Sequence, residues 1–497
     1  MTIALNFRGE RIEAPVFEQR CRRAARALQD AGVGAGDVVA LLLRNGPLAL
    51  EGMLAARSIG ALWCPINWHF KTDEVAYILA NSGAKVLIAD AALLAGLGAL
   101  ELQGVATFVC EAQAPPHLGW EAQRDAAPPI DTPSVAPRGA MFYTSGTTGR
   151  PKGIQRAAAS PELASKGLAV LSHALGFEPG MRALLSAPMY HSAPNSYSIG
   201  AAQMAGAELF IEERFDAERT LQLIAQHRLT HAYLVPTMYV RLLALPEATR
   251  RRYDLRSMRF VASTGSPCAP DIKRAMIEWW GPVIHEAYGA SELGYMTRLD
   301  SAEALRKPGS AGKPLPGVTM AILDTDGHTL AQGQAGLIYV HQPAFPEFTY
   351  IGNDAAREKI ERNGLKTMGD IGYLDEDGYL FIVDRSADLV ISGGVNIYPA
   401  EIEAALQMLP GVADCAVFGI PDAEFGEALA AGVQRSEGDA GAALTPDAVR
   451  AFLRERLADY KVPRVVTFHV ALPREDTGKI FKRKLREPYW AGQARRI

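Results

Sequence analysis

The sequence predicts an α/β protein with a large N-terminal domain of mixed sheets and packed helices, followed by a small α+β C-terminal domain. Two observations carry this prediction. Apolar runs of strand length alternate with helical patterns through the first half of the chain, which favours largely parallel sheets. After about residue 310, short strands with turn signals replace that alternation, and helical patterns return only near the C-terminus. A length of 497 residues allows about two to four domains.

The individual elements follow from apolar spacing and from residues that start or stop helices. A first amphipathic helix is expected over 15–31, and a helix followed by a strand is expected within 47–67, with a stop at Gly60. Another helix, 72–83, is expected to have Thr72 as its N-cap and Gly83 as its stop. The remaining elements of the alternation are strands at 37–43, 85–90, 207–213, 230–236 and 258–264, and helices at 216–229 and 269–280.

Beyond residue 310 the turn sequences DTDG and DEDG predict hairpins. A domain boundary is expected near Arg385–Asp388, giving domains 1–385 and 386–497. In the second domain, helices are expected over 399–411 and 445–463, with a strand between them over 412–422. The segment 110–138, rich in Ala and Pro, is expected to loop over the surface.

Composition excludes several functional classes. The formal net charge is −4, so no global basic field attracts nucleic acid. The N-terminus lacks a secretory signal pattern, and no apolar run is long enough for a membrane span. The five cysteines are scattered without a CxxC pair, which indicates neither a zinc site nor a disulfide framework. We therefore expect a reduced, cytoplasmic protein that acts on small molecules.

The segment TSGTTGRPKG, residues 144–153, has the composition of an anion-binding loop. Glycines let backbone N–H groups approach an anion, hydroxyls add donors and Lys152 adds a cation. The spacing excludes a Walker loop, because Gly146 and Gly149 are only three residues apart and Lys152 is not followed by Ser or Thr.

The same segment resembles the phosphate loop of the adenylate-forming superfamily, which includes acyl-CoA synthetases, luciferases and peptide-synthetase adenylation domains. The resemblance implies that the loop holds the β- and γ-phosphates of ATP, with Thr147 near Mg²⁺, and that Lys152 binds ATP without reacting. The ATP-binding residues implied here are Thr144, Ser145, Gly146, Thr147, Thr148, Gly149 and Lys152.

Two further segments resemble motifs of the same superfamily. In YGASE, residues 288–292, Tyr288 would stack on adenine, Ser291 would contact the α-phosphate, and Glu292 would hold Mg²⁺ through oxygen. The segment TGSP, residues 264–267, is similar to the small-residue loop beside adenine. The other nucleotide-binding residues implied by these two motifs are Gly265, Ser266, Pro267, Ala287, Gly289 and Ala290.

The segment MGDIGYLDEDGYLFIVDR, residues 368–385, resembles the ribose-binding motif. Asp370 would accept both ribose hydroxyls, Ile382 would pack on the ribose, and Arg385 would offer its fork of donors to ribose or phosphate oxygens. Taken alone, Asp370 would be assigned as a turn residue.

The segment LPREDTGKIFKRKL, residues 472–485, resembles the superfamily's C-terminal motif. The resemblance implies that Lys479 stabilises the negative charge that develops during adenylation. Together with Thr147, Glu292 and His191, it is one of the four residues expected to be catalytic. Outside this context Lys479 would be one more solvated lysine in a basic tail.

The segment SADLVISGGVNIYPAEIE, residues 386–403, is similar to the hinge and glycine loop of acyl-CoA synthetases. Ala387 stands at the hinge position, where Asp or Lys is commoner, and a small residue can still absorb a rotation. Ser392, Gly393 and Gly394 would face the CoA arm. The C-terminal domain would then be a mobile lid that rotates between two half-reactions.

The segment PMYHSAPNSYS, residues 188–198, concerns the acid. It lacks the Asp by which amino-acid-activating relatives pair with an ammonium group, so an amino acid is not expected. His191 is placed at the carboxylate end, although a core histidine is the alternative. The residues assigned to the acyl pocket are small apart from His191: His191, Ala193, Ser198, Gly265, Gly289 and Ala290.

The resemblance therefore implies an acid–thiol ligase that uses ATP, Mg²⁺ and CoA, with bacterial fatty-acyl and bile-acid CoA ligases as the most similar branch. The acid would be fatty or otherwise bulky and hydrophobic. The alternatives are an aryl-acid CoA ligase of the benzoate or cinnamate kind, an adenylation enzyme that loads a carrier protein, and a luciferase-like oxygenase. A homodimer is compatible with this assignment.

Overall fold

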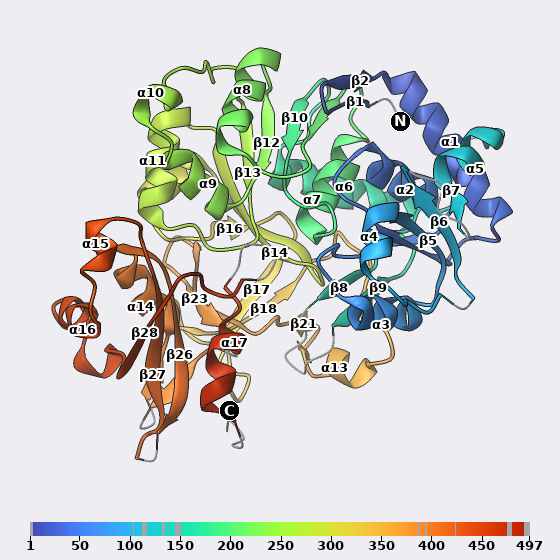
Figure 1. Cartoon of the computed structure of the whole chain (residues 1–497). Coiled ribbons are helices and arrows are strands. Elements are labelled where there is room, and N and C mark those ends of the chain that lie inside the picture. The colour runs from blue at the N-terminus through green and yellow to red at the C-terminus, as the bar shows by residue number, and fades with distance from the viewer. Residues whose placement is uncertain are drawn as a thin grey trace. The chain divides into compact units, whose positions relative to one another are not determined.

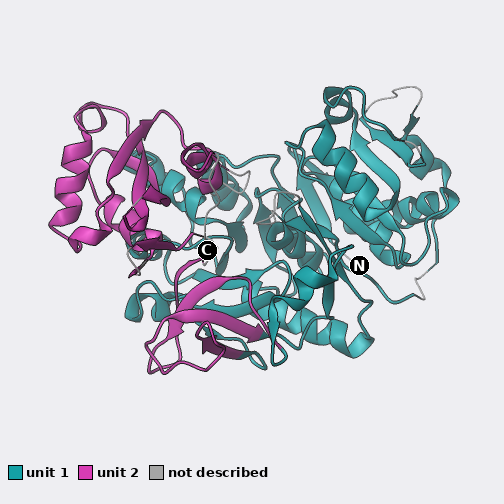
Figure 2. Cartoon of the chain, turned by 90° about the horizontal axis from the view of Figure 1, so that it is seen from below, with its two compact units in different colours: residues 1–319, 341–364 teal, residues 320–340, 365–497 magenta. Residues whose placement is uncertain are grey.

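The computed structural model describes residues 3–102, 104–111, 117–131, 135–144, 151–385, 388–392, 395–422, 424–474 and 480–491 (Figure 1). They form two compact units (Figure 2). Unit 1 comprises residues 1–319 and 341–364, and unit 2 comprises residues 320–340 and 365–497. The predicted α/β class with a large N-terminal and a small C-terminal part is confirmed. The predicted boundary at Arg385 stays a prediction, because the hairpin residues before it group with the C-terminal residues.

The larger sheet of unit 1 has nine strands, in the order β16-β15-β14-β13-β12-β10-β11-β1-β2. The six strands from β14 to β1 run parallel, and β2, β15 and β16 are antiparallel additions at the two edges. In that spatial order the strands are Lys313–Pro314, Gly294–Leu299, Ile284–Ala290, Phe260–Ser263, His231–Leu234, Arg182–Leu185, Glu208–Ile211, Ala4–Phe7 and Glu10–Ile12.

Helices cover both faces of this sheet. Packing pairs α6 with α7, and it pairs α9 with both α8 and α11 (Figure 1). The chain leaves β10 in one direction to reach β11, then returns past β10 to β12 and continues to β13 and β14. With right-handed crossovers, this reversal sends α7 to one face and α9 and α11 to the other. The helices are α6 Pro161–Leu175, α7 Ser192–Ala201, α8 Ala217–His227, α9 Pro236–Leu243 and α11 Pro270–Trp280.

The reversal creates a topological switch point between β10 and β12. Loops that leave the carboxyl ends of these two strands turn to opposite faces of the sheet and leave a crevice there, which is where open α/β sheets bind ligands. The segment that carries His191 follows β10, and the segments that carry Gly265 and Glu292 follow β13 and β14. The fold therefore gathers predicted site segments at one edge of the sheet.

A second, fully parallel sheet of unit 1 has the order β4-β3-β5-β6-β7. Its strands are Leu62–Pro65, Val38–Leu42, Ala84–Asp90, Ala106–Cys110 and Leu118–Gly119, and its helices include α1 Ala14–Asp30, α2 Pro47–Ser58, α3 Thr72–Ser82 and α5 Trp120–Ala126. The apolar positions of α1, among them Phe17 and Leu28, are buried in the main core, as their helical spacing predicts. All five cysteines are free and buried.

A small antiparallel sheet, β19-β9-β8, completes the part of unit 1 that concerns the site. Its strands are Phe348–Tyr350, Lys152–Arg156 and Phe142–Thr144. Strands β8 and β9 flank the predicted phosphate loop, so their pairing of Thr144 with Lys152 fixes the two ends of that loop.

Unit 2 contains an antiparallel group, β17 Thr319–Leu323, β18 Gly336–His341, β22 Asp370–Leu374 and β23 Leu380–Arg385. A second sheet has the order β25-β24-β27-β26, with β28 Val465–His469 parallel to β27 Gly426–Arg435. Strand β24 is Val390–Ser392 and strand β25 is Val395–Ile397. The DEDG turn joins β22 to β23 as predicted. The predicted strand at 412–422 is β26, Val412–Asp422. Helices α14 Pro399–Leu406 and α16 Pro446–Arg454 end earlier than predicted.

Two local predictions are wrong. The N-cap of α3 is Lys71 rather than Thr72, whose hydroxyl instead donates to the Leu97 carbonyl at 2.6 Å. The segment 110–138 is not only a surface loop, because α5 buries Trp120 completely. The Trp120 indole N–H donates to the buried Glu51 carboxylate at 2.9 Å.

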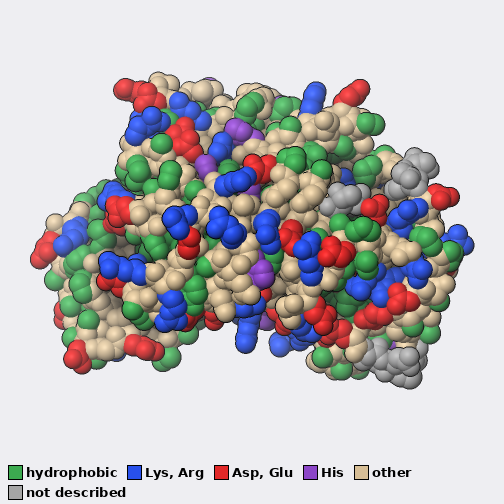
Figure 3. Space-filling model, turned by 90° about the horizontal axis from the view of Figure 1, so that it is seen from above, with side chains coloured by type: hydrophobic (Ala, Val, Ile, Leu, Met, Phe, Trp, Pro, Cys, Tyr) green, Lys and Arg blue, Asp and Glu red, His purple; other side chains and the backbone are tan. Residues whose placement is uncertain are grey.

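No described helix is both long and apolar enough to cross a membrane. Basic and acidic side chains are interspersed over the face that Figure 3 shows.

Candidate functional site

Two segments far apart in the sequence meet at Glu292. The Thr144 hydroxyl, at the end of β8, donates to Glu292 Oε1 at 3.2 Å. The Glu292 side chain follows β14 and is only 8% exposed. The structure therefore joins the first residue of the predicted phosphate loop to the carboxylate that the sequence assigns to Mg²⁺.

Strand β19 supplies a third group. The Tyr350 hydroxyl also donates to Glu292 Oε1, at 3.2 Å. The Tyr350 ring lies under Lys152, whose Nζ is 5.1 Å from the ring centroid. Burial raises the pKa of Tyr350, and Glu292 raises it further, so the phenol stays protonated and remains a hydrogen-bond donor.

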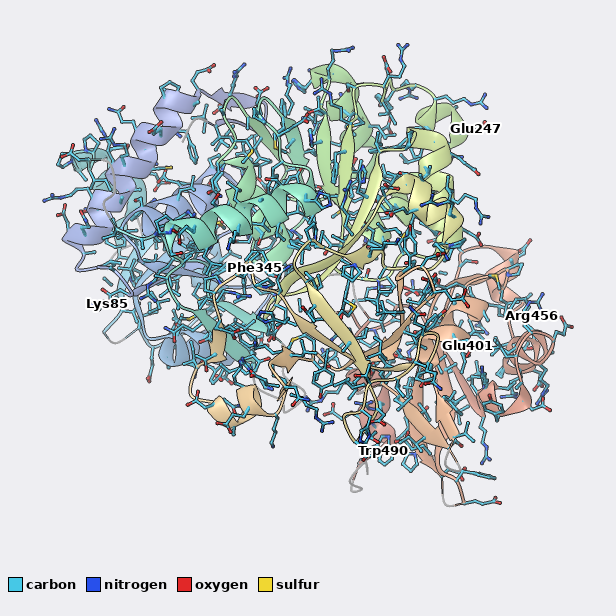
Figure 4. All side chains as sticks on the ribbon, turned by 180° about the vertical axis from the view of Figure 1, so that it is seen from behind. Lys85, Glu247, Phe345, Glu401, Arg456 and Trp490 are labelled. Atoms are coloured by element: carbon cyan, nitrogen blue, oxygen red, sulfur yellow. The ribbon has the colours of Figure 1, made fainter. Side chains whose placement is uncertain are left out.

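Arg156 holds the backbone at the end of β14. Its Nη2 donates to the carbonyls of Ser291, at 3.2 Å, and of Glu292, and its Nη1 donates to the Pro346 carbonyl at 2.6 Å. The guanidinium also lies 5.9 Å from the Phe345 ring, and Figure 4 labels Phe345. Burial lowers the pKa of Arg156 to about 10, so the guanidinium remains charged near neutral pH.

On the other side of Glu292, the Ser291 hydroxyl donates to Ser192 Oγ at 2.7 Å. Ser192 is the first residue of α7, and His191 is its N-cap. The His191 ring lies 4.3 Å from the ring of Tyr190. The predicted α-phosphate residue therefore bonds the residue that directly follows the predicted carboxylate-end residue His191.

These side chains fit Mg²⁺. The ion is hard and takes oxygen ligands. The Glu292 carboxylate offers such oxygens, with the hydroxyl oxygens of Thr144 and Tyr350 beside it.

The residues assigned to adenine and to the acyl chain differ in burial and in backbone conformation. Gly265 is exposed and has a φ of +95°, a conformation that L side chains rarely adopt. A Cβ on Gly289 would lie 2.6 Å from the Gly294 carbonyl oxygen, so glycine is required there by the close approach of β15. Ser198 is fully buried and its hydroxyl donates within α7 to the Asn195 carbonyl at 2.8 Å.

The other residues predicted at this site differ in how far they are buried. Ala287 is buried in β14, Tyr288 is half-buried opposite Thr297, and a β-bulge follows Tyr288. Ser266, Pro267, Ala290 and Ala193 are half-buried or exposed.

In unit 2, Asp370 and Arg385 are paired across β22 and β23. The Arg385 Nε donates to Asp370 Oδ1 at 3.0 Å, and Asp370 is only 5% exposed. Ile382 lies on β23, and Ser392 ends β24 opposite Val395. Asp370 is therefore held in a hydrogen-bonded ion pair and is not merely a turn residue.

Several predicted residues lie outside the described part of the chain. They are Ser145, Gly146, Thr147, Thr148 and Gly149 of the phosphate loop, the hinge residue Ala387, the CoA-facing Gly393 and Gly394, and Lys479.

Three residues near the site were not predicted: Tyr350, Arg156 and Ser192. Ser192 lies within the segment 188–198 and Arg156 lies three residues after the phosphate-loop segment 144–153, but neither residue carries a motif signal of its own. Tyr350 carried no signal, because only the pairing of β19 with β9 brings it to Glu292.

The comparisons with known proteins agree with this arrangement. Residues 2–346 match the family model described as AMP-binding enzyme, and residues 401–479 match the model described as AMP-binding enzyme C-terminal domain.

Two curated relatives and one solved structure align over nearly the whole chain. The chain is 34% identical to a feruloyl-CoA synthase of an Amycolatopsis species, over 95% of this chain and 93% of the relative. It is 33% identical to the long-chain-fatty-acid–CoA ligase FadD13 of Mycobacterium tuberculosis, over 94% and 91% of the two chains. The ATP-bound structure of MatB from Rhodopseudomonas palustris superposes with a TM-score of 0.86 at 30% identity, covering 98% of this chain and 95% of that chain.

These matches cover most of the chain and contain the motif residues that meet at Glu292. The chain therefore belongs to the AMP-binding enzyme family, the adenylate-forming superfamily, as an acyl-CoA synthetase.

Proposed function

We propose that this enzyme joins a bulky, largely apolar carboxylic acid to ATP, giving an acyl-adenylate and pyrophosphate, and then transfers the acyl group to CoA. The observation that carries the proposal is the hydrogen bond between Thr144 and Glu292. It unites two motifs, 148 positions apart, that the nucleotide-binding assignment requires to be neighbours.

In the first half-reaction, an oxygen of the acid's carboxylate attacks the α-phosphorus. A bond forms between that oxygen and phosphorus, and the bond from phosphorus to the bridging oxygen breaks as pyrophosphate leaves. Negative charge grows on the phosphoryl oxygens, and fixed cations and donors stabilise it. In the second half-reaction, the CoA sulfur attacks the acyl carbon, the thiol proton is lost, and AMP departs.

Residues of unit 1 have separate roles in this chemistry. Lys152 and the loop 145–149 bind the β- and γ-phosphates, and the Ser291 hydroxyl contacts the α-phosphate. Glu292, held by Thr144 and Tyr350, would bind Mg²⁺, which when bound neutralises phosphate charge. Arg156 keeps the Ser291–Glu292 backbone in place. Tyr288 and the segment 265–267 line the adenine.

Residues of unit 2 have their own roles in this proposal. Asp370 accepts the ribose hydroxyls, with Arg385 and Ile382 beside it. Lys479 stabilises charge in adenylation, and the chain after Ala387 then turns about that hinge so that Ser392, Gly393 and Gly394 face the CoA arm. The hydrogen bond from Arg385 to Asp370 supports the ribose role, because it orients that carboxylate.

The acid is proposed to be fatty or otherwise bulky and hydrophobic, with an aryl acid as the second candidate. The relatives support both, since one acts in feruloyl-CoA synthesis and the other on long-chain fatty acids. His191 is proposed at the carboxylate end, because Ser192 beside it bonds Ser291.

The test is AMP release with ATP and CoA across a panel of carboxylic acids, for the natural chain and for Lys479→Ala. We expect CoA-dependent AMP release for at least one acid. Lys479→Ala should lose adenylation by at least about 100-fold, yet still form thioester from a supplied acyl-adenylate. AMP release that is independent of CoA would overturn the ligase assignment, and full turnover in Lys479→Ala would overturn the role of that lysine.

A further inference from the structure

Two buried asparagines of unit 1 hold the segment that leads from β10 to α7. Residues 186–191 lie between that strand and that helix, so their backbone groups need partners other than those of a regular element. Asn45, which lies between β3 and α2, and Asn195, on α7, supply such partners. They are only 2% and 1% exposed, and neither belongs to the residues assigned to ATP, Mg²⁺ or CoA.

The Asn45 amide joins this segment to a neighbouring strand end. Its Nδ2 donates to the carbonyls of Ala187, at 2.9 Å, and of Glu212, which follows β11, at 3.1 Å. Its Oδ1 accepts the Met189 N–H at 2.8 Å. Because both amide hydrogens are donated to carbonyls, a reversed amide would set its oxygen against two other oxygens. The amide therefore has one favourable orientation, and it fixes residues 187–189 from the side of β3.

The Asn195 amide holds Met189 through its other backbone group. The Asn195 Nδ2 donates to the Met189 carbonyl at 3.0 Å and to Met53 Sδ at 3.3 Å. Its Oδ1 accepts the Trp63 indole N–H at 3.1 Å. Trp63 lies on β4 and Met53 on α2, and both are buried, so the second sheet and its helix orient this amide. Met189 thus has its N–H and its carbonyl each bonded to a buried asparagine.

Met189 lies within the turn that presents His191. The His191 N–H donates to the Pro188 carbonyl at 3.1 Å, which closes a turn over 188–191. The His191 carbonyl accepts the Asn195 N–H at 3.0 Å, in the first turn of α7. The connection is short, and it is anchored at Met189 before His191 and by the helix after it. The position of the imidazole therefore depends on the bonds that Met189 makes.

We propose that Asn45 and Asn195 are positioning residues for the acid's carboxylate. They fix the turn and so set where His191 stands, and neither asparagine needs to touch the acid. The inference deepens the proposed function and rests on it, because it takes His191 as the residue at the carboxylate end. The hydrogen bond from Ser291 to Ser192 supports this direction, since it ties the residue after His191 to the proposed α-phosphate residue.

The network should affect the acid more than ATP. The six hydrogen bonds of the two amides involve none of the residues assigned to ATP. Glu292 is held independently, by Thr144 and Tyr350. Reacting groups gain rate from being held in the right geometry, so a small displacement at the carboxylate end is enough to weaken productive binding of the acid.

The test measures KM for the acid and KM for ATP separately, by AMP release from the full chain with CoA and the most reactive acid of the panel. Asn45→Ala and Asn195→Ala should each raise KM for the acid about tenfold, the effect of one good hydrogen bond, and leave KM for ATP within about twofold. Trp63→Phe removes only the bond that orients Asn195, so it should raise KM for the acid about threefold. This milder variant keeps the inference falsifiable if the asparagine variants fold poorly.

The matched control is Trp120→Phe. The Trp120 indole N–H also donates to a buried side chain of unit 1, that of Glu51, at 2.9 Å, but neither residue bonds the turn 188–191. Trp120→Phe should lower the free energy of unfolding at least as much as Trp63→Phe, because its partner is a carboxylate, and should keep KM for the acid within about twofold. Chemical denaturation of each variant separates the loss of stability from the effect on KM.

The outcomes separate this inference from the function beneath it. If the natural chain releases no AMP with any acid, the proposed function fails, and with it the role of His191 that the inference assumes. If acids are activated but the asparagine variants and Trp63→Phe keep the natural KM for the acid, the inference alone is overturned. It is also overturned if KM for the acid and KM for ATP rise together, or if Trp120→Phe raises KM for the acid as much as Trp63→Phe does, since the network would then only stabilise the fold.

Discussion

The Lys482 ammonium lies 2.8 Å from Glu403 Oε1, joining the segment after the proposed catalytic loop to helix α14. Both side chains are largely buried, at 16% and 17% exposure. Burial alone would lower the pKa of Lys482, but Glu403, Asp388 and Asp384 outweigh it and raise that pKa. Lys482 is thus a charged centre that ties together three acidic residues of unit 2.

The first prediction concerns Lys482→Met. Removing one partner leaves buried carboxylates without their cation, so we expect unit 2 to lose about 3 kcal/mol of unfolding free energy. Because Lys482 lies three residues after Lys479, adenylation should fall more than thioester formation from supplied acyl-adenylate. Chemical denaturation and the two half-reaction assays measure these effects. Arg483→Met, at the exposed neighbouring position, is the control. It should change the free energy of unfolding by no more than about 0.5 kcal/mol, and the balance between the two half-reactions should stay as in the natural chain.

The second prediction concerns Glu292 and its donor Tyr350. Glu292→Gln keeps the size of the side chain but removes the charge, so pyrophosphate exchange should fall at least about 100-fold and require more Mg²⁺. Tyr350→Phe removes one hydrogen bond to that carboxylate and should reduce exchange by about tenfold or less. Titrating exchange against Mg²⁺ measures both. Glu247→Gln, on exposed helix α10, Glu247–Arg250, is the control, and Figure 4 labels it. Full exchange by Glu292→Gln at low Mg²⁺ would contradict the assignment.

The third prediction concerns Gly289, which the sequence assigns to the acyl pocket. A Cβ there would lie 2.6 Å from the Gly294 carbonyl oxygen, so Gly289→Ala must displace β15. We expect a loss of about 1–3 kcal/mol in unfolding free energy, as for other overpacked sites. Because the strand ends that hold Ser291 and Glu292 move together, activity should fall alike for large and small acids. A loss confined to large acids would show that Gly289 lines the pocket instead.

Much of the fold could be predicted because the patterns are local. A mainly apolar run of strand length predicts β26 over Val412–Asp422, and the helical spacing of α1 places Phe17 and Leu28 in the core. The motifs likewise predict that Thr144 and Glu292 share one site, because each motif carries its own chemistry. Each of these predictions rests on patterns within single segments, whose residues are neighbours in the sequence.

The features that the sequence did not predict depend on distant partners. Helix α5 forms where a surface loop was expected, since Trp120 and Arg124 bond Glu51, about 70 positions earlier. Tyr350 reaches Glu292 only because β19 pairs with β9.

The last prediction concerns pH and His285, which stacks on Phe260 with ring centroids 3.9 Å apart. Burial lowers the pKa of His285 to about 4, and Arg298 lowers it further, through its Nη2 at 3.0 Å from Nδ1. His231, on the other side of Phe260, has its pKa lowered to about 4, again mainly by burial. Both imidazoles are therefore neutral in the fold near pH 6 and charged in the unfolded chain.

The sign of the effect follows from proton binding. Below the unfolded pKa of about 6.5, the unfolded chain binds more protons than the folded one, so stability falls as the pH decreases toward 4. Between pH 7 and pH 5, His285 alone should contribute a loss of about 2 kcal/mol. Urea denaturation at pH 7 and at pH 5 measures the free energy of unfolding. Between these pH values, we expect that free energy to fall less in His285→Gln than in the natural chain. His328→Gln, in an exposed turn, should keep the natural slope. An unchanged slope in His285→Gln would mean that this ring is already protonated in the folded protein, with Arg298 displaced from its side.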